Sequence, residues 1–415
     1  MANNLYPHRS TFLKQQALDA WSYFQEKGYP HPKNENWRFS NISNWLLENS
    51  PINKYKEEFS TNKFSKHIIT NTYPIYILND SVFSPNKSPF DIEIFNMNQI
   101  SKNNFDNIAI GSIANYKNNS FTAENMALFQ NCCVINIPEN TIIDKPIHLI
   151  HDIIGNEDNR VYPRLFIKVG AGSEVKILQT EIGSDNYQHF INSVDEIIVN
   201  ENAKLDWTTM QQRNLCSGQI SSFNISIDNN ACVNYNTFEF GSGFIRREIN
   251  TYFNAMGGDF KFNCLFLPMD KQHMDISSMI HHKNAHCNSN QLVKGVLGEK
   301  SSGVFRGLAY VHRGAKKTDA TQTNHNLLLS STARMNSIPQ LEIYDDDVKC
   351  AHGATTGQID KDAIFYLQSR GINKEVAIEL MVKGFVDEVV DKIKIPKVVR
   401  IIKNKLIEKM KDIIK

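Results

Sequence analysis

A thiol and an imidazole stand two positions apart near the end of the chain, at Cys350 and His352 in "DDDVKCAHGATTGQID". In an extended segment, residues i and i+2 point to the same side, so these side chains can reach one common atom. Thiolate and imidazole suit zinc, copper or iron–sulfur chemistry better than magnesium or calcium. Two ligands do not complete a site. The alternative is that Cys350 and His352 only finish the last strand before a helical segment.

A second group of metal-ligating residue types is "HHKNAHC", which crowds His281, His282, His286 and Cys287 together. Its spacing matches no established zinc pattern. A surface turn with incidental histidines is therefore favoured over transient metal binding. The three acids at 345–347 alternate faces in a strand, and we interpret them as a solvated edge rather than as ligands of a hard cation.

A glycine-rich stretch, "GVLGEKSSG" at 295–303, has part of the pattern of a phosphate-binding loop. That pattern needs a glycine immediately before the lysine, whereas Glu299 precedes Lys300 here. A carboxylate at that position repels phosphate. We therefore expect that this chain binds no ATP.

The seven cysteines are scattered and odd in number, which fits reduced thiols in a cytosol better than a disulfide framework. Adjacent cysteines rarely form a good disulfide, so Cys132 and Cys133 are predicted to be buried beside an apolar stretch. Cys216, Cys232 and Cys264 lie in strand-like stretches and are predicted to be buried as well.

The charge balance excludes two classes of partner. Lysine plus arginine number 45 and aspartate plus glutamate 44, which gives no bulk electrostatic attraction to nucleic acid or to an anionic membrane. The first residues lack the apolar core of a signal peptide, and no apolar run approaches the roughly 20 residues of a membrane span. We expect a cytoplasmic protein.

The elements that position these residues fall into three expected domains: an N-terminal helical domain (1–85), a β-rich core (86–350) and a C-terminal helical domain (351–415). The first helix is predicted to stop at Gly28, and a short helix near 42–47 follows. In the last part, Asp360 and Asn373 are predicted to begin helices, and a basic amphipathic tail follows Pro396.

Four stretches of the β-rich core superpose on one another. Each has an apolar residue, a small or polar turn, and a second apolar residue six positions later. The pairs are Ile137/Ile143, Val169/Val175, Val199/Leu205 and Ile227/Val233. A fifth, looser copy begins at Tyr252. A strand–turn–strand unit recurring about every 30 residues predicts a parallel β-helix with one coil per repeat. A β-sandwich is the alternative, but it does not require the recurring six-residue offset.

Longer stretches carry a family resemblance. From Lys294 to Phe385 the chain resembles the SufB/SufD family of SUF-system iron–sulfur cluster assembly proteins, through "GVFRGLAYV", "KKTDATQTNHNLLLS", "PQLEIYDDDVKCAHGATTGQID" and "IFYLQSRGI" followed by "ELMVKGFVDEVVDKI". A weaker similarity lies in "NENWRFSNI" near the N-terminus. The resemblance implies a mainly β fold, a right-handed parallel β-helix core between helical ends.

Within this family the chain resembles SufD rather than SufB. SufB-like chains carry His-Glu-Ala-Thr where this chain has His352, Gly353, Ala354 and Thr355. They also carry a cysteine just before the segment that matches "NLLLS", and residues 323–326 contain none. One departure from SufD relatives is a histidine at 325, where arginine is usual.

The resemblance also implies a role and partners. SufD pairs with SufB, a nascent iron–sulfur cluster forms at their interface, and His352 matches the SufD ligand, with Cys350 beside it as a second ligand or an assisting group. The ATPase SufC docks on the helices between Asp360 and Ile393. The chain is then a scaffold and not an enzyme. A homodimer of the isolated chain stays open.

Two other classes of function are weighed against this one. Parallel β-helices also serve as carbohydrate-active enzymes, but the expected solvent positions Lys168, Asp206 and Asn234 show no acidic pair in register. A stand-alone metal carrier requires the 281–287 cluster to bind a metal tightly, and it ranks below both alternatives.

Overall fold

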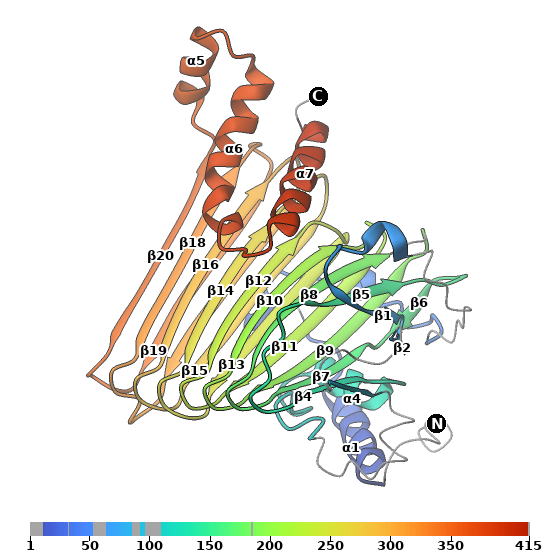
Figure 1. Ribbon diagram of the computed structural model, residues 1–415. Helices are drawn as coiled ribbons and strands as arrows, with labels where there is room; N and C mark the ends of the chain where they lie inside the picture. Colours follow the sequence, from blue (N-terminus) through green and yellow to red (C-terminus); the bar gives the residue numbers. More distant parts are fainter. Residues whose placement is uncertain are drawn as a thin grey trace.

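Two mostly parallel β-sheets, wound from one continuous chain, form the body of the protein (Figure 1). The chain alternates between the sheets, and each strand pairs with the strand one coil earlier, which makes a β-solenoid of about seven turns. The predicted parallel β-helix with helices at both ends is confirmed. The computed structural model describes residues 11–31, 33–52, 64–84, 92–95, 109–183 and 186–413.

One sheet ends in strand β20 and is called the β20 sheet. Its order is β2-β1-β5-β8-β10-β12-β14-β16-β18-β20. The strands are β1 (Tyr73–Leu78), β2 (Ser81–Phe83), β5 (Ile147–Ile153), β8 (Glu174–Gly183), β10 (Lys204–Gln212), β12 (Cys232–Glu239), β14 (Asp259–Phe266), β16 (Asn288–Leu297), β18 (Asp319–Leu328) and β20 (Lys349–Gln358).

The other sheet ends in strand β19 and is called the β19 sheet. Its order is β19-β17-β15-β13-β11-β9-β7-β4-β3, and β6 pairs with β9. The strands are β3 (Glu93–Phe95), β4 (Cys133–Ile137), β6 (Asn159–Val161), β7 (Arg164–Val169), β9 (His189–Val199), β11 (Gly218–Ile227), β13 (Phe244–Phe253), β15 (His273–His282), β17 (Ser302–Val311) and β19 (Arg334–Ile343).

The six-residue spacing in the sequence is a corner between the two sheets. Each corner contains a residue with a left-handed backbone, which asparagine and glycine adopt at the lowest steric cost. These residues are Asn140 (φ 54°), Gly172 (66°), Asn202 (57°), Asn230 (52°) and Gly257 (74°). The corners stack on one another: the backbone N–H of Asn202 donates to the carbonyl of Asn229 at 2.9 Å.

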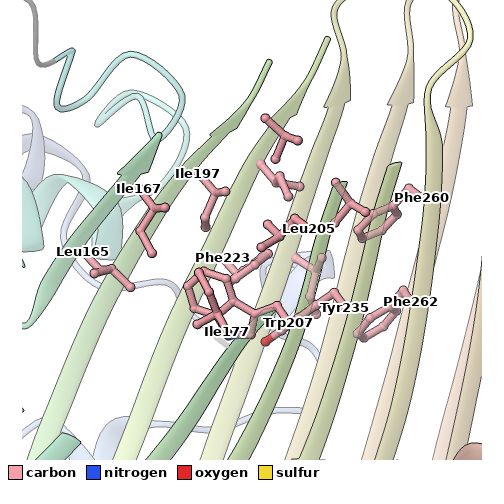
Figure 2. Packing of buried hydrophobic residues seen from close by; sticks show 14 of the residues in the cluster. Leu165, Ile167, Ile177, Ile197, Leu205, Trp207, Phe223, Tyr235, Phe260 and Phe262 are labelled. Carbon is pink, nitrogen blue, oxygen red and sulfur yellow. The ribbon is translucent and has the colours of Figure 1, made fainter. Parts of the chain in front are cut away.

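The inward side chains of both sheets close a continuous apolar core. Ile167, Ile197 and Ile225 lie in register on three successive strands and are fully buried. Aromatic rings from neighbouring coils pack beside them (Figure 2). Phe223 stacks on Tyr235 with ring centroids 4.1 Å apart. Stacked pairs of this kind contribute about 0.5–1.5 kcal/mol beyond the area that they bury.

The solenoid continues beyond the coils that the sequence pattern revealed. The fifth copy starts one residue earlier than predicted, because Ile225 pairs with Thr251 and not with Tyr252. The next coil was hidden because His282 and Ser289 occupy the two positions that are apolar in earlier coils. A pattern defined by isoleucine and valine therefore misses it.

The N-terminal helices cover the outer face of the β19 sheet. Helices α1 (Thr11–Lys27) and α4 (Ser120–Leu128) pack on each other, and Phe166 and Val134 belong to the same apolar cluster. Gly28 ends α1 with φ 63°, as predicted. The helix expected near 42–47 is a three-residue 3₁₀ turn, and Leu47 with φ 49° follows it. The 3₁₀ turns are η2 (Glu35–Trp37), η3 (Ser43–Trp45) and η4 (Ser65–His67).

Three C-terminal helices follow the last strand: α5 (Lys361–Ser369), α6 (Lys374–Val390) and α7 (Pro396–Ile413). Asp360 caps α5 by accepting from two backbone N–H groups, and Asn373 caps α6, as predicted. The amphipathic tail α7 packs on the outer face of the β20 sheet, through Val398, Ile402, Leu406 and Met410. In the described ranges, no helix is both long and apolar enough to cross a membrane.

The solenoid extends past both limits of the expected core at 86–350. Strand β1 precedes residue 86 and pairs in parallel with β5, and β20 continues to Gln358. Among the described residues, no further coil covers strand β20, so its residues are almost all exposed. Accordingly, β20 does not alternate apolar and polar residues as the covered strands do. The boundary between 85 and 86 lies outside the described residues.

Buried neutral histidines make the solenoid sensitive to acid. His148 is fully buried, and its Nε2 lies 2.9 Å from Thr180 Oγ1, while its Nδ1 has no hydrogen-bond partner in the described structure. Burial, reinforced by His67, lowers the pKa of His148 from its ordinary 6.5 to about 3. Between these values the unfolded chain binds the proton and the folded chain does not. The stabilisation from this group is thus complete above pH 6.5 and is lost as the pH falls toward 3.

We therefore expect His148→Gln to gain stability relative to the wild type on acidification, by about 1.4 kcal/mol per pH unit below pH 6.5. Glutamine keeps a donor for Thr180 but does not titrate. Urea unfolding of both proteins at pH 7.5, 6 and 5 measures the difference. A difference that is the same at all three pH values contradicts the assignment of a neutral buried His148.

Candidate functional site

The last strands of the two sheets, β19 and β20, lie at the same end of the solenoid (Figure 1). We call this end of the solenoid the open end. Within the described residues, β19 pairs with β17 alone and β20 with β18 alone. Strand β20 is exposed along nearly its whole length. Such an edge presents backbone N–H and C=O groups that can pair with another strand.

Cys350 and His352 lie on β20 at this open end. Their register partners on β18 are Ala320 and Gln322, which are both buried inside the solenoid. Since parallel strands in register turn paired side chains to the same face, Cys350 and His352 point to the inner side of the β20 sheet. His352 is exposed and Cys350 half-buried because no later coil covers them. The strand places both on one face, and their role as ligands stays a prediction.

The electrostatics of Cys350 favour a protonated thiol in the free chain. Burial raises its pKa, and the nearby Asp319 raises it further, whereas the backbone of Ala320 lowers it. In the described part of the chain, no three His, Cys, Asp or Glu side chains converge to hold a metal. A metal at Cys350 and His352 would have these two side chains as its ligands from the described residues, and binding through the thiolate requires loss of the thiol proton.

Two of the three acids at 345–347 have contacts at the turn into β20. Asp345 accepts a hydrogen bond from the Gly314 N–H at 3.0 Å, and Asp347 forms an ion pair with Lys317 at 2.7 Å. Both contacts join the last turn to the turn one coil earlier. These acids thus act structurally at the edge of the solenoid, in agreement with the interpretation from the sequence.

The "HHKNAHC" residues do not converge on one point. His282 points inward and its Nε2 lies 2.9 Å from Ser289 Oγ, whereas His281 points outward. His286 occupies the left-handed corner with φ 60°. The thiol of Cys287 is buried and donates to the carbonyl of Ala255 at 3.3 Å. The stretch is a strand end followed by a corner, which separates the four side chains.

The predictions for the other cysteines are correct in part. Cys132, Cys133 and Cys264 are buried, and burial raises the pKa of Cys133 to about 12. For Cys216 and Cys232 the prediction is wrong, because both are exposed. Cys216 lies in the turn between β10 and β11, and Cys232 begins β12 on its outward side.

The glycine-rich stretch at 295–303 joins two strands. It ends β16 and begins β17, and its turn contains Glu299 with φ 49°. The Glu299 carboxylate accepts a hydrogen bond from the Asp270 N–H at 2.6 Å. A phosphate-binding loop is instead followed by a helix.

Sequence reasoning missed a network of charges inside the solenoid. Arg247 is buried and forms ion pairs with Glu239 and, at 3.2 Å, with Glu181. Gln219 donates to Glu181 at 2.7 Å, and Arg213 donates to Gln219 at 3.0 Å. Burial alone would raise the pKa of Glu181, but the Arg247 and Arg213 guanidiniums outweigh it and hold the pKa at about 2.

An exposed apolar surface lies on the C-terminal helices. Phe365 and Tyr366 on α5 are 71% and 58% exposed, and Leu380 on α6 is 45% exposed. Figure 1 shows α5 standing clear of both sheets, whereas α7 lies against the β20 sheet. We call Phe365, Tyr366, Val376 and Leu380 the α5–α6 surface. An exposed apolar patch of this kind is typical of a protein-binding site.

Two family models match the chain, one on each side of residue 150. The family described as "SUF system FeS cluster assembly, SufBD core domain" matches residues 152–385, and the SufBD N-terminal region matches residues 2–149. The chain belongs to the SufBD family. The core match begins at the end of β5, covers the later coils of the solenoid, and ends within α6.

Individual relatives point to the same pathway. The chain is 33% identical over 250 residues to the iron–sulfur cluster assembly protein SufD of Escherichia coli, covering 60% of this chain and 59% of the relative. A SufBD family protein of Synechocystis is 32% identical over 285 residues (66% and 63%), and the chloroplastic protein ABCI7 of Arabidopsis thaliana is 31% identical over 270 (62% and 56%). The matched part is less than two thirds of each of these relatives.

Proposed function

We propose that the chain is the SufD-like subunit of a SufBCD-type scaffold for iron–sulfur cluster assembly. In this proposal, the open end pairs with a SufB-like subunit, and a nascent cluster forms between the two. His352 is a ligand of that transient cluster, and Cys350 is a second ligand or assists. The cluster is the cargo of the scaffold, and this chain binds no ATP itself.

One observation carries the proposal: Cys350 and His352 share one face of an end strand with an unpaired edge. A side chain on the inner face of a central coil is sealed by the next coil, and these two are not. A partner strand added at the open end would cover them and bring its own ligands within reach. Thiolate and imidazole are suitable donors for iron–sulfur chemistry.

The α5–α6 surface supports a second contact in the same proposal. A SufC-like ATPase docks there, on α5 and the first turns of α6, whereas the C-terminal half of α6 packs on the β20 sheet (Figure 1). Phe365 and Leu380 supply apolar area that is not buried in this chain. Energy from ATP then enters the scaffold through the partner and not through this subunit.

Co-purification tests this assembly. The tagged chain is co-expressed with SufB-like and SufC-like subunits, and we expect all three in one complex. Phe365→Ser combined with Leu380→Ser should reduce the captured ATPase at least tenfold and leave the SufB-like subunit in place, because both substitutions lie on helices and outside the end strands β19 and β20. Lys374→Ala, an exposed change on α6, is the matched control.

Three results would count against the proposal. These are failure to capture a SufB-like subunit, steady ATP hydrolysis by the purified single chain, and full ATPase capture by the double variant. The first argues against pairing at the open end, the second against a scaffold role, and the third against docking at the α5–α6 surface.

A further inference from the structure

A row of aromatic rings crosses the outward face of the β19 sheet. Tyr252, His281 and Tyr310 lie in register on β13, β15 and β17. The rings of Tyr252 and His281 are stacked, with centroids 5.0 Å apart and planes within 5° of parallel. Tyr310 lies 5.6 Å from His281, and Tyr344 extends the row at 5.2 Å from Tyr310. The stacking fixes the orientation of the His281 ring.

A second imidazole, that of His312 in the corner after β17, contacts this row. His312 lies two positions after Tyr310, and its Nε2 is 3.3 Å from Nδ1 of His281. Two nitrogens that occupy adjacent corners of a tetrahedron around Zn²⁺, with Zn–N about 2.0–2.1 Å, are about 3.3–3.4 Å apart. The observed separation therefore fits a shared metal ion without a change in the distance between the nitrogens.

Both rings are suited to metal binding at neutral pH. Burial, followed by His312 and Lys283, lowers the pKa of His281 to about 4, and burial also lowers the pKa of His312. Without metal, the N–H of one ring donates a hydrogen bond to the unprotonated nitrogen of the other ring. For a metal ion to bind, the donating ring shifts that proton to its other nitrogen, and the two facing nitrogens then each present a lone pair.

The site is open to solvent. His281 lines a groove of about 670 Å³ between the N-terminal segment and the outward face of the β19 sheet, together with Tyr29, Trp37 and Tyr252. His281 and His312 are each half-buried, so water can fill further coordination positions. Lys283 lies over the Tyr252 ring at 4.9 Å, and its charge weakens the binding of a cation.

We propose that His281 and His312 form a binding site for a divalent transition-metal ion of the class that prefers imidazole ligands, such as Zn²⁺. The two histidines supply two ligands and water supplies the others. The bound ion links β15 to the corner that follows β17, and thereby stabilises two successive coils. This site lies on the β19 sheet and is independent of Cys350 and His352 on the β20 sheet.

Zn²⁺ titration of the full chain at pH 7.5, in competition with a chromophoric chelator, tests the site. All proteins carry Cys350→Ser and His352→Ala, so the open end does not contribute its thiol and imidazole. His281→Phe and His312→Phe keep an aromatic ring but remove the nitrogen ligand. His286→Asn is the control, because it removes a nearby exposed imidazole and asparagine suits the left-handed corner.

Each phenylalanine variant is expected to lose one Zn²⁺ equivalent or to bind it at least tenfold more weakly, while His286→Asn binds as the parent does. Zn²⁺ should also raise the Tm of the parent and of His286→Asn, but not that of the phenylalanine variants. His312→Ala, at a half-exposed position, provides the test if a phenylalanine variant does not fold. Equal Zn²⁺ binding by all variants, or a loss in only one of the two histidine variants, would overturn the proposal.

Discussion

Cells that depend on this chain for iron–sulfur cluster assembly are expected to stop growing when His352 is replaced by alanine. The imidazole is exposed at the open end, and under the proposed function its removal leaves the nascent cluster short of one donor. The fold should not suffer, since substitutions at exposed positions usually change stability by less than about 0.5 kcal/mol. Complementation in a strain in which the SUF system is the sole assembly route measures the effect.

Two further variants sharpen this experiment. His325→Ala removes an imidazole from the neighbouring strand β18, where it contacts Thr355 on the opposite side of the sheet, and growth should be normal. Cys350→Ser decides the role of the thiol: growth as poor as with His352→Ala indicates a ligand, and intermediate growth an assisting group. Normal growth with His352→Ala, in a complex of normal composition, would show that Cys350 and His352 have only a structural role in the last strand.

The second large effect concerns the buried charges. Arg247→Ala is expected to lower the free energy of unfolding by about 3–5 kcal/mol, because it leaves Glu181 and Glu239 buried without their shared cation. Both carboxylates are buried inside the solenoid, and water entering the space left by the side chain would not supply a positive charge. Urea denaturation followed by circular dichroism measures the change.

Lys261→Ala is the matched control for this substitution. Lys261 also faces a carboxylate, Asp259 at 3.7 Å, but its side chain is 60% exposed, so its loss should cost less than about 1 kcal/mol. Replacing Glu239 by glutamine in the Arg247→Ala background should recover part of the loss, since it removes one unpaired charge. Equal small effects of Arg247→Ala and Lys261→Ala would show that the network contributes little to stability.

The solenoid was predictable from the sequence because its corners repeat. An apolar residue, a left-handed asparagine or glycine, and a second apolar residue recur where each coil changes sheet, as at Val199, Asn202 and Leu205. This signal disappears where His282 and Ser289 fill the same positions with a hydrogen-bonded pair. A polar pair can replace an apolar pair inside a stacked coil, and a hydropathy pattern does not detect it.

The candidate site was predictable in part for a similar reason. The i, i+2 spacing of Cys350 and His352 placed them on one face of a strand, but the exposure of that face depends on β20 being the last strand of its sheet. The pairing of His281 with His312 is not visible in the sequence either, because it joins residues from two different coils. Register between distant strands determines such contacts, and spacing within one motif does not reveal it.

The iron and sulfide content of the co-purified complex tests the central claim most directly. The complex is isolated anaerobically from cells that express the chain with its SufB-like and SufC-like partners, and its visible absorption is recorded. We predict a cluster in the wild-type and His325→Ala complexes, and its loss in a His352→Ala complex with the same subunit composition. A His352→Ala complex with wild-type iron, sulfide and absorption would contradict the claim that this chain supplies a cluster ligand at its open end.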